Sequence, residues 1–316
     1  MKNILNVTSS PHIKHPDTTM GIMLDVVIAL LPAAVFGCVL FGWRAIVALV
    51  TCVAVAVLSE YLWNKILKKP CTVDDLSAVV TGLILGMNLP SHIPLWMAAI
   101  GSVVAIIVVK QMFGGIGCNF ANPAMAARIV LMVSFPVAMT VYREPLNVDV
   151  VTSATPLTYL FEGGEGMPTL KNLFFGFHSG CIGETSSFLL LLGGLYLVAR
   201  RVISPIIPVC FIGTVAFASL ISGDNVSIAV FGGGLMLGAI FMATDYTTSP
   251  TTPLGKAVFG VGCGLIAFVI RKFAALPEGV SYAILIMNIL VPYINRYTLK
   301  KPFGFVKPLK EGKADA

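Results

Sequence analysis

The chain has 316 residues, of which 57% are hydrophobic and only 11% are charged. Ordinary soluble domains carry about 25% charged residues, so the polar residues here could not cover a globule of this size. The composition therefore excludes a water-soluble domain and predicts an all-α polytopic membrane protein. The net charge of +6 comes from lysines and arginines in short loops, which is typical of membrane topology, so no nucleic-acid partner is expected.

Ten apolar stretches are long enough, or nearly so, to cross a bilayer as helices, which takes about 17–25 residues. In chain order we predict spans at 21–41, 45–64, 76–90, 94–110, 121–140, 186–203, 205–222, 226–243, 256–271 and 279–297. Most loop cations, Lys110 among them, fall on one side of these spans, which the positive-inside rule assigns to the cytoplasm. We therefore expect both termini in the cytoplasm and the segment 140–185 outside.

The long outer segment divides the spans into two sets of five, and an odd number per set makes the two halves opposite in orientation. We predict an N-terminal membrane repeat at 1–140, an extracytoplasmic loop at 141–185, a C-terminal inverted repeat at 186–297 and a cytoplasmic tail at 298–316. Gly82-Leu-Ile-Leu-Gly86 recurs as Gly234-Leu-Met-Leu-Gly238, each followed by a polar, proline-containing break. Paired breaks are typical of discontinuous helices that line a buried site, although Gly-xxx-Gly also serves close helix packing.

Three acidic residues, Asp25, Glu60 and Asp245, lie in or beside the predicted spans. An ionisable group in a membrane is a functional candidate because burying it is costly unless it is paired. Each lies near a predicted cytoplasmic end, so an ion or cofactor role and a loop role both stand. The seven cysteines occur without metal-ligand spacing, so no metal site is predicted. No triad, Rossmann fingerprint or P-loop is present, so no catalytic residue is predicted.

The segment from Phe113 to Pro123 combines three glycines with Asn119 and Asn122 and leads into a predicted span. Glycines permit close backbone approach, the two amides offer donors and acceptors, and Pro123 suits a first helical turn. The pattern predicts a pocket for an uncharged polar heterocycle near the inner face. A capped re-entrant turn would produce the same pattern.

The outer loop contains Asp149-Val-Val-Thr-Ser-Ala-Thr155. This stretch resembles the flavinylation motif in which a dedicated transferase joins the phosphate of FMN to the last hydroxyl. The spacing matches at Asp149, Thr152, Ala154 and Thr155, and it departs at Ser153, where glycine is usual. The resemblance implies a covalent FMN phosphoester at Thr155, whose hydroxyl is expected to be accessible outside the bilayer.

Other stretches carry a resemblance over essentially the whole chain, namely Ser10-Pro-His-Ile, Asn119-Phe-Ala-Asn-Pro-Ala124, Gly180-Cys-Ile-Gly-Glu-Thr-Ser186 and Ala243-Thr-Asp-Tyr-Thr-Thr-Ser-Pro250. Together they resemble the D subunit of the Rnf complex, a ferredoxin:NAD⁺ oxidoreductase that couples electron transfer to Na⁺ or H⁺ translocation. Its sister family is the B subunit of the sodium-translocating NADH:quinone reductase. The resemblance implies a ten-helix inverted repeat similar to urea-transporter folds. It also implies a second, non-covalent riboflavin or FMN, for which we expect Asn119, Asn122 and Asp245 as contacts.

Further expectations follow from the same resemblance. Gly183, Glu184, Thr185 and Ser186 would lie near the covalent FMN, at a helix N-terminus that favours anions, although a simple cap by Thr185 or Ser186 would explain the pattern as well. The implied partners are the A and E membrane subunits of the Rnf complex, its FMN-bearing G subunit, its peripheral C subunit, a flavin transferase and the lipid of the bacterial inner membrane. NAD and ferredoxin are expected to bind other subunits, so this chain would act as part of an oxidoreductase and not as an enzyme by itself.

Two functions of other classes compete with this interpretation. A solute channel or secondary transporter would explain the repeat and the broken helices, but not the motif that ends at Thr155. A purely structural membrane anchor would leave the polar breaks without a purpose.

Overall fold

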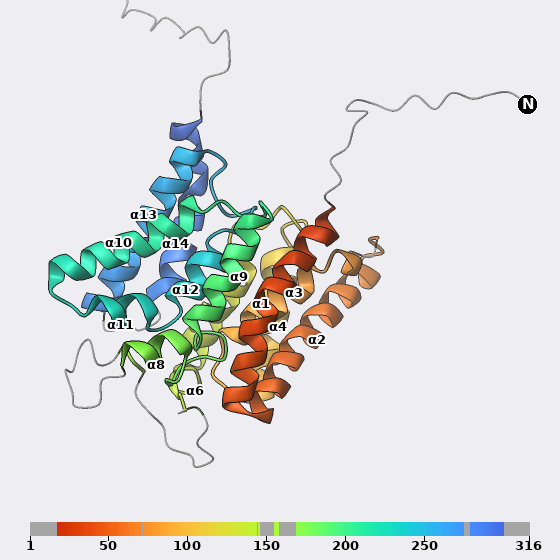
Figure 1. Ribbon diagram of the computed structural model, residues 1–316. Helices are drawn as coiled ribbons and strands as arrows, with labels where there is room; N and C mark the ends of the chain where they lie inside the picture. Colours follow the sequence, from red (N-terminus) through yellow and green to blue (C-terminus); the bar gives the residue numbers. More distant parts are fainter. Residues whose placement is uncertain are drawn as a thin grey trace, which may run out of the picture.

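The computed structural model describes residues 18–70, 72–143, 145, 155–157, 169–274 and 279–299. Its regular structure is helical, which confirms the all-α prediction (Figure 1). In chain order the elements are α1 Thr19–Phe41, α2 Trp43–Ile66, η1 Val73–Asp75, α3 Ser77–Met87, α4 Leu95–Val103, η2 Val104–Gln111, α5 Pro123–Ser134, α6 Pro136–Thr140, α8 Leu170–Phe175, α9 Ser187–Ala199, α10 Ile206–Ser222, α11 Val226–Phe231, α12 Leu235–Leu237, η3 Gly238–Met242, α13 Pro253–Phe273 and α14 Gly279–Thr298.

The helices have the length and surface of membrane spans. Among the described residues, α1, α2 and α13 are long and apolar enough to cross a bilayer, and α3, α4 with η2, α5, α9 and α10 are shorter apolar helices. Large apolar side chains such as Val39, Leu195 and Leu220 point outward from these helices and are exposed. Such a surface suits lipid and not water, so the chain is integrated in a membrane.

Two predicted spans are wrong as continuous helices. The stretch 226–243 is interrupted between α11 and α12 by Gly232, Gly233 and Gly234, and Gly233 has a φ of +67°. Glycine disfavours helix interiors because it has the most backbone freedom to lose. The stretch 121–140 is interrupted at Phe135, because Pro136 has no N–H to continue the α5 hydrogen-bond ladder.

The helices form two groups that pack against each other in the centre of the molecule. Figure 1 shows α1 to α4 together on one side and α10, α13 and α14 on the other, with α9 alongside α1. Buried residues from both groups, including Leu30, Leu85, Leu235 and Phe259, form one apolar core. This core joins the two groups into one body.

Irregular backbone interrupts this core at 88–94, 112–122, 232–234 and 243–252. These breaks bring polar side chains such as Asn88 and Asn122 into the interior.

The two Gly-xxx-Gly motifs have different roles in the fold. Gly82 lies within α3, where an added Cβ would meet the α2 backbone at Val53 at 2.8 Å, whereas Gly234 precedes α12 and faces Glu184. Close helix packing therefore explains the first motif.

Candidate functional site

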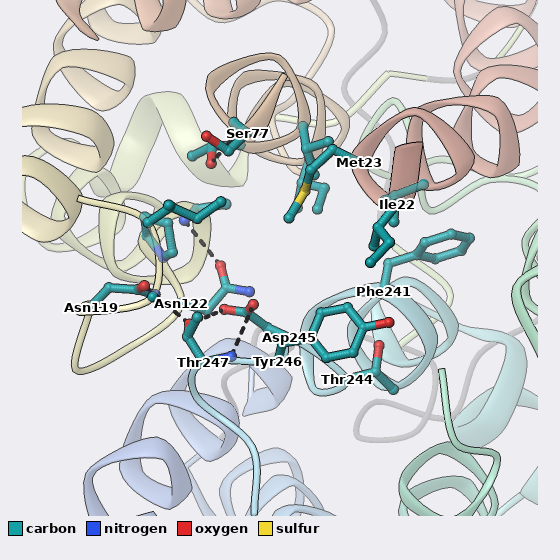
Figure 2. A pocket seen from close by; sticks show the side chains of 18 of the residues that line it. Ile22, Met23, Ser77, Asn119, Asn122, Phe241, Thr244, Asp245, Tyr246 and Thr247 are labelled. Carbon is teal, nitrogen blue, oxygen red and sulfur yellow. Dashed lines mark hydrogen bonds between the residues drawn. The ribbon is translucent and has the colours of Figure 1, made fainter. Parts of the chain in front are cut away.

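The described residues line a cavity of about 470 Å³ (Figure 2). Its walls are mostly apolar and come from α1, α3, α9 and η3, and its polar side comes from the breaks at 112–122 and 243–252. This volume lies within the range of about 300–1,000 Å³ that is usual for cofactor and small-molecule sites. Among its lining residues are Ile22, Met23, Val26, Val80, Ile84, Phe241, Asn119, Asn122, Asp245 and Thr247.

Asn119, Asn122 and Asp245, which sequence reasoning assigned to one flavin, line this one cavity. Figure 2 shows them on one side, with Ile22 and Phe241 on another. The Thr247 hydroxyl connects Asn119 and Asp245, because its oxygen lies 3.0 Å from Asn119 Oδ1 and 3.1 Å from Asp245 Oδ2. Two breaks more than a hundred residues apart in sequence therefore form one polar surface.

Asn122 has a structural role as well as a position in the cavity. Its Oδ1 accepts hydrogen bonds from the backbone N–H groups of Ala124 and Met125, so Asn122 is the N-cap of α5, and Pro123 occupies the first turn. Its Nδ2 donates to the Met242 carbonyl oxygen at 3.2 Å. The capped turn that the sequence left as an alternative is therefore present, and the cap holds Asn122 at the cavity wall.

Asp25 and Glu60 do not line the cavity. Asp25 pairs with Arg200 at 3.2 Å and accepts a hydrogen bond from Tyr196; the Asp25 side chain is 13% exposed and that of Arg200 is 59% exposed. Glu60 is fully buried and pairs with Lys110, whose Nζ lies 2.8 Å from Glu60 Oε2. The prediction that Lys110 is a loop cation is wrong, since Lys110 is only 3% exposed.

Lys110 is a cavity residue that sequence reasoning missed. Its ammonium group donates to Glu60 and to the Ser77 hydroxyl, and both Lys110 and Ser77 line the cavity. Gln111 adds a hydrogen bond to Glu60 at 2.9 Å. An acid and a base near the same predicted end of the second and fourth spans were the available signal, because buried charges in membranes are usually paired.

Glu60→Gln is expected to destabilise the protein by about 3–5 kcal/mol, because it leaves the Lys110 ammonium buried without its counter-charge. Thermal unfolding of the purified protein in detergent measures the effect. Asp25→Asn is the control, since it removes an ion pair whose Arg200 side chain is 59% exposed and should change stability by at most about 1 kcal/mol. Equal losses in the two variants would contradict the neutralising role of Glu60.

A second polar cluster surrounds Arg128 of α5, which is 1% exposed. Its guanidinium donates to Asn88 Oδ1 at 2.6 Å and to Glu184 Oε1 at 3.1 Å, and it contacts the Cys181 sulfur. Sequence reasoning missed Arg128, although a cation inside a predicted span was a signal. Glu184, predicted to lie near FMN, is thus an ion-pair partner.

The predicted residues 183–186 divide into different roles. Gly183 donates its N–H to the Met87 carbonyl oxygen at 2.7 Å, and a Cβ there would approach the Met87 side chain to 2.5 Å, so the close contact requires glycine. Ser186 is the N-cap of α9, which matches the simple-cap alternative. Thr185 is buried and donates to the Ile182 carbonyl oxygen.

Thr155 lies beside Glu184 in a small cavity of about 10 Å³ that Tyr142, Ser179, Gly180 and Gly234 also line. The structure therefore brings the predicted attachment residue next to the predicted 180–186 segment. The expectation of an accessible hydroxyl is wrong, since Thr155 is only 8% exposed. The reason is local packing, because the neighbouring Leu157 is buried against the backbone of Gly233. Asp149, Thr152, Ser153 and Ala154 lie outside the described residues.

These features define a class, a helical membrane protein with interrupted helices and a cavity that has mostly apolar walls and one polar side. The chain belongs to the NQR2, RnfD, RnfE family, whose profile matches residues 6–304.

Its curated relatives are similar over nearly their whole length. The chain is 47% identical to the D subunit of the Na⁺-translocating ferredoxin:NAD⁺ oxidoreductase complex of Acetobacterium woodii, over 98% of both chains. It is 44% identical to the D subunit of the proton-translocating complex of Clostridium ljungdahlii, over 96% of this chain and 97% of that one. It is 38% identical to the D subunit of the ion-translocating oxidoreductase complex of Stutzerimonas stutzeri, over 90% of this chain and 91% of that one. The family resemblance predicted from the sequence is confirmed.

Proposed function

We propose that this chain is the D subunit of an Rnf-type complex that transfers electrons between ferredoxin and NAD⁺ and couples this transfer to Na⁺ or H⁺ translocation. In this role it carries two flavins, an FMN joined to Thr155 and a non-covalent riboflavin or FMN in the 470 Å³ cavity. The names and full-length similarity of its relatives favour this function over a solute channel. The other Rnf subunits would supply the ferredoxin and NAD sites.

The observation that carries the inner site is the convergence of Asn119, Asn122 and Asp245 on one cavity. The residues present fit a flavin, which is a planar, largely apolar ring system with a hydrogen-bonding edge. The walls from α1, α3 and η3 offer apolar surface for the faces of a ring. The polar breaks offer donors and acceptors along one side, as cofactor sites require.

Each polar residue can make a defined contribution when a flavin is bound, and the flavin supplies one- and two-electron transfer. Asn119 Nδ2 donates one hydrogen bond to the Ala121 carbonyl oxygen, and Asn122 Nδ2 donates one to Met242. Each amide nitrogen carries a second N–H that can donate to a ring carbonyl. The apolar walls exclude water, which strengthens such hydrogen bonds.

The outer site rests on the motif that ends at Thr155 and on family membership. A cavity of about 10 Å³ cannot contain a flavin, so the ring of an FMN on Thr155 would lie outside it. The Arg128–Glu184 pair would hold the 181–184 segment in place behind the attachment residue. Because the hydroxyl is buried in this arrangement, the transferase would act on Thr155 while the segment 155–157 is displaced.

Flavin partition on denaturation tests the two-flavin proposal. The complex is purified from cells that possess the flavin transferase, denatured in acid and washed. We expect this chain to retain one covalent flavin, which is fluorescent in a denaturing gel. The second, non-covalent flavin of this chain should appear in the supernatant. A chain that is colourless after washing, together with no such flavin in the supernatant, would contradict the proposal.

We further propose the ten-span inverted repeat with cytoplasmic termini. Helices lie at each predicted span, and interrupted helices occur in both halves. Substitution of Gly163 by cysteine, in the predicted outer loop, should create a site that an impermeant maleimide labels in intact cells. Labelling only after permeabilisation would reverse the orientation.

A further inference from the structure

Three basic side chains from separate segments meet at the end of the bundle where α2 begins and α6 ends. Arg44 lies in the first turn of α2, His92 lies in the break between α3 and α4, and Arg143 follows α6. The Arg44 guanidinium contacts His92 Nε2 directly. Arg143 acts electrostatically on both of the other residues. None of the three lines the 470 Å³ cavity proposed for a flavin or the small cavity at Thr155.

The charge of this basic cluster is not balanced within the part of the chain that the structure describes. The ion pairs there involve Lys110, Arg128, Arg200 and Lys272, and none involves Arg44 or Arg143. His92 Nδ1 and Arg143 Nε are buried atoms with no hydrogen-bond partner among the described residues. Converging cations with unused donors are typical of an anion site.

The electrostatics of the cluster agree with this interpretation. Burial and the two neighbouring arginines lower the pKa of His92 to about 4. Burial and the Arg44 guanidinium lower the pKa of Arg143 as well. Both shifts report an environment with excess positive charge, which a bound anion would relieve.

The position of the cluster selects the kind of anion. Trp43 is 69% exposed and precedes Arg44, and Trp96 is 54% exposed four residues after His92, with its ring edge-on to Phe135. Exposed tryptophans mark the level of the lipid headgroups. The anions held at that level in quantity are phospholipid phosphates, and guanidinium groups bind phosphate with paired N–H donors.

We propose that Arg44, His92 and Arg143 bind the phosphate of an anionic phospholipid headgroup, with the acyl chains along Trp43 and Trp96. The lipid would then hold together the start of α2, the α3–α4 break and the segment after α6. This site is independent of the flavin assignments, so its test does not depend on them.

Native mass spectrometry of the detergent-purified complex tests the site. The probes are dioleoyl-phosphatidylglycerol, dioleoyl-phosphatidylcholine and inorganic phosphate. The double variant Arg44→Gln/Arg143→Gln should bind phosphatidylglycerol roughly 30-fold more weakly than wild type, from the usual contribution of two cations near a lipid surface. Lys171→Gln is the matched control, because it removes an exposed cation from α8 at the same end (Figure 1) and should bind as wild type does.

Thermal unfolding is measured in parallel, and the single variant Arg44→Gln, at an exposed position, replaces the double variant if the latter unfolds. Preferential retention of phosphatidylglycerol over phosphatidylcholine by wild type and by Lys171→Gln, with loss in the arginine variant, supports the proposal. Equal retention by all chains overturns it. Displacement of the lipid by inorganic phosphate assigns the cluster to a free anion and also overturns it.

Discussion

Thr155→Val is expected to abolish covalent flavin in this chain. Valine has nearly the shape of threonine but no hydroxyl, so no phosphoester can form at this position. Because Thr155 is buried, loss of its hydroxyl should also lower stability by about 1 kcal/mol, which leaves the chain folded. In-gel fluorescence of the denatured chain should disappear, and its mass should fall by that of FMN less one water. Electron transfer through the complex should stop.

Thr158→Val is the matched control for this change. Thr158 lies in the same loop, three positions after Thr155, and is off the motif. This variant should keep both its fluorescence and its added mass. If Thr155→Val still carries the mass of FMN less one water, the assignment is wrong. It is equally wrong if the wild-type peptide that spans Thr155 is unmodified in cells that possess the transferase.

Val26→Phe is expected to reduce the affinity for the non-covalent flavin by roughly fivefold or more. Val26 lies on α1 and lines the 470 Å³ cavity, so a phenylalanine there would occupy space that the ring needs. Overfilling a packed site usually costs about 1–3 kcal/mol, which corresponds to roughly five- to hundredfold in affinity. Flavin released by acid denaturation and separated by chromatography measures the loss, and the fluorescence of the covalent flavin should not change.

Val215→Phe makes the same substitution at the wall of a different cavity. That cavity has about 250 Å³, lies between α10, α11 and α13, and is not assigned to a flavin. The control variant should therefore release as much flavin as wild type. Full release from Val26→Phe, or equal losses in both variants at equal thermal stability, would contradict the placement of the second flavin.

Asn122→Leu is a less selective test than the sequence alone would indicate. The sequence marked Asn122 as a hydrogen-bonding group for a ligand, but the structure shows that its Oδ1 caps α5. Loss of an N-cap typically costs about 0.5–2 kcal/mol. A lower amount of bound flavin in that variant could thus result from a weakened α5 helix or from a lost contact with the flavin. Val26→Phe leaves the cap intact.

The sequence by itself determined the membrane class, the approximate positions of most helices and several residues of the polar breaks. These features depend on local composition, because about 17–25 apolar residues cross a bilayer and clustered glycines and prolines favour interruptions of a helix. Asn119, Asn122 and Asp245 could be chosen for the same reason, since they are polar residues at such interruptions. The motif at Thr155 was likewise a linear pattern.

Only the tertiary structure decided which distant residues meet. It placed Lys110 against Glu60 and Arg128 against Glu184, and it buried Thr155 beside the 180–186 segment. A linear pattern does not predict these contacts, because pairing partners 50 or more residues apart depend on how the helices pack around their small residues. In a membrane, a buried charge is stabilised by an opposite charge or by backbone carbonyl groups, and the packing of the helices determines which of these it meets.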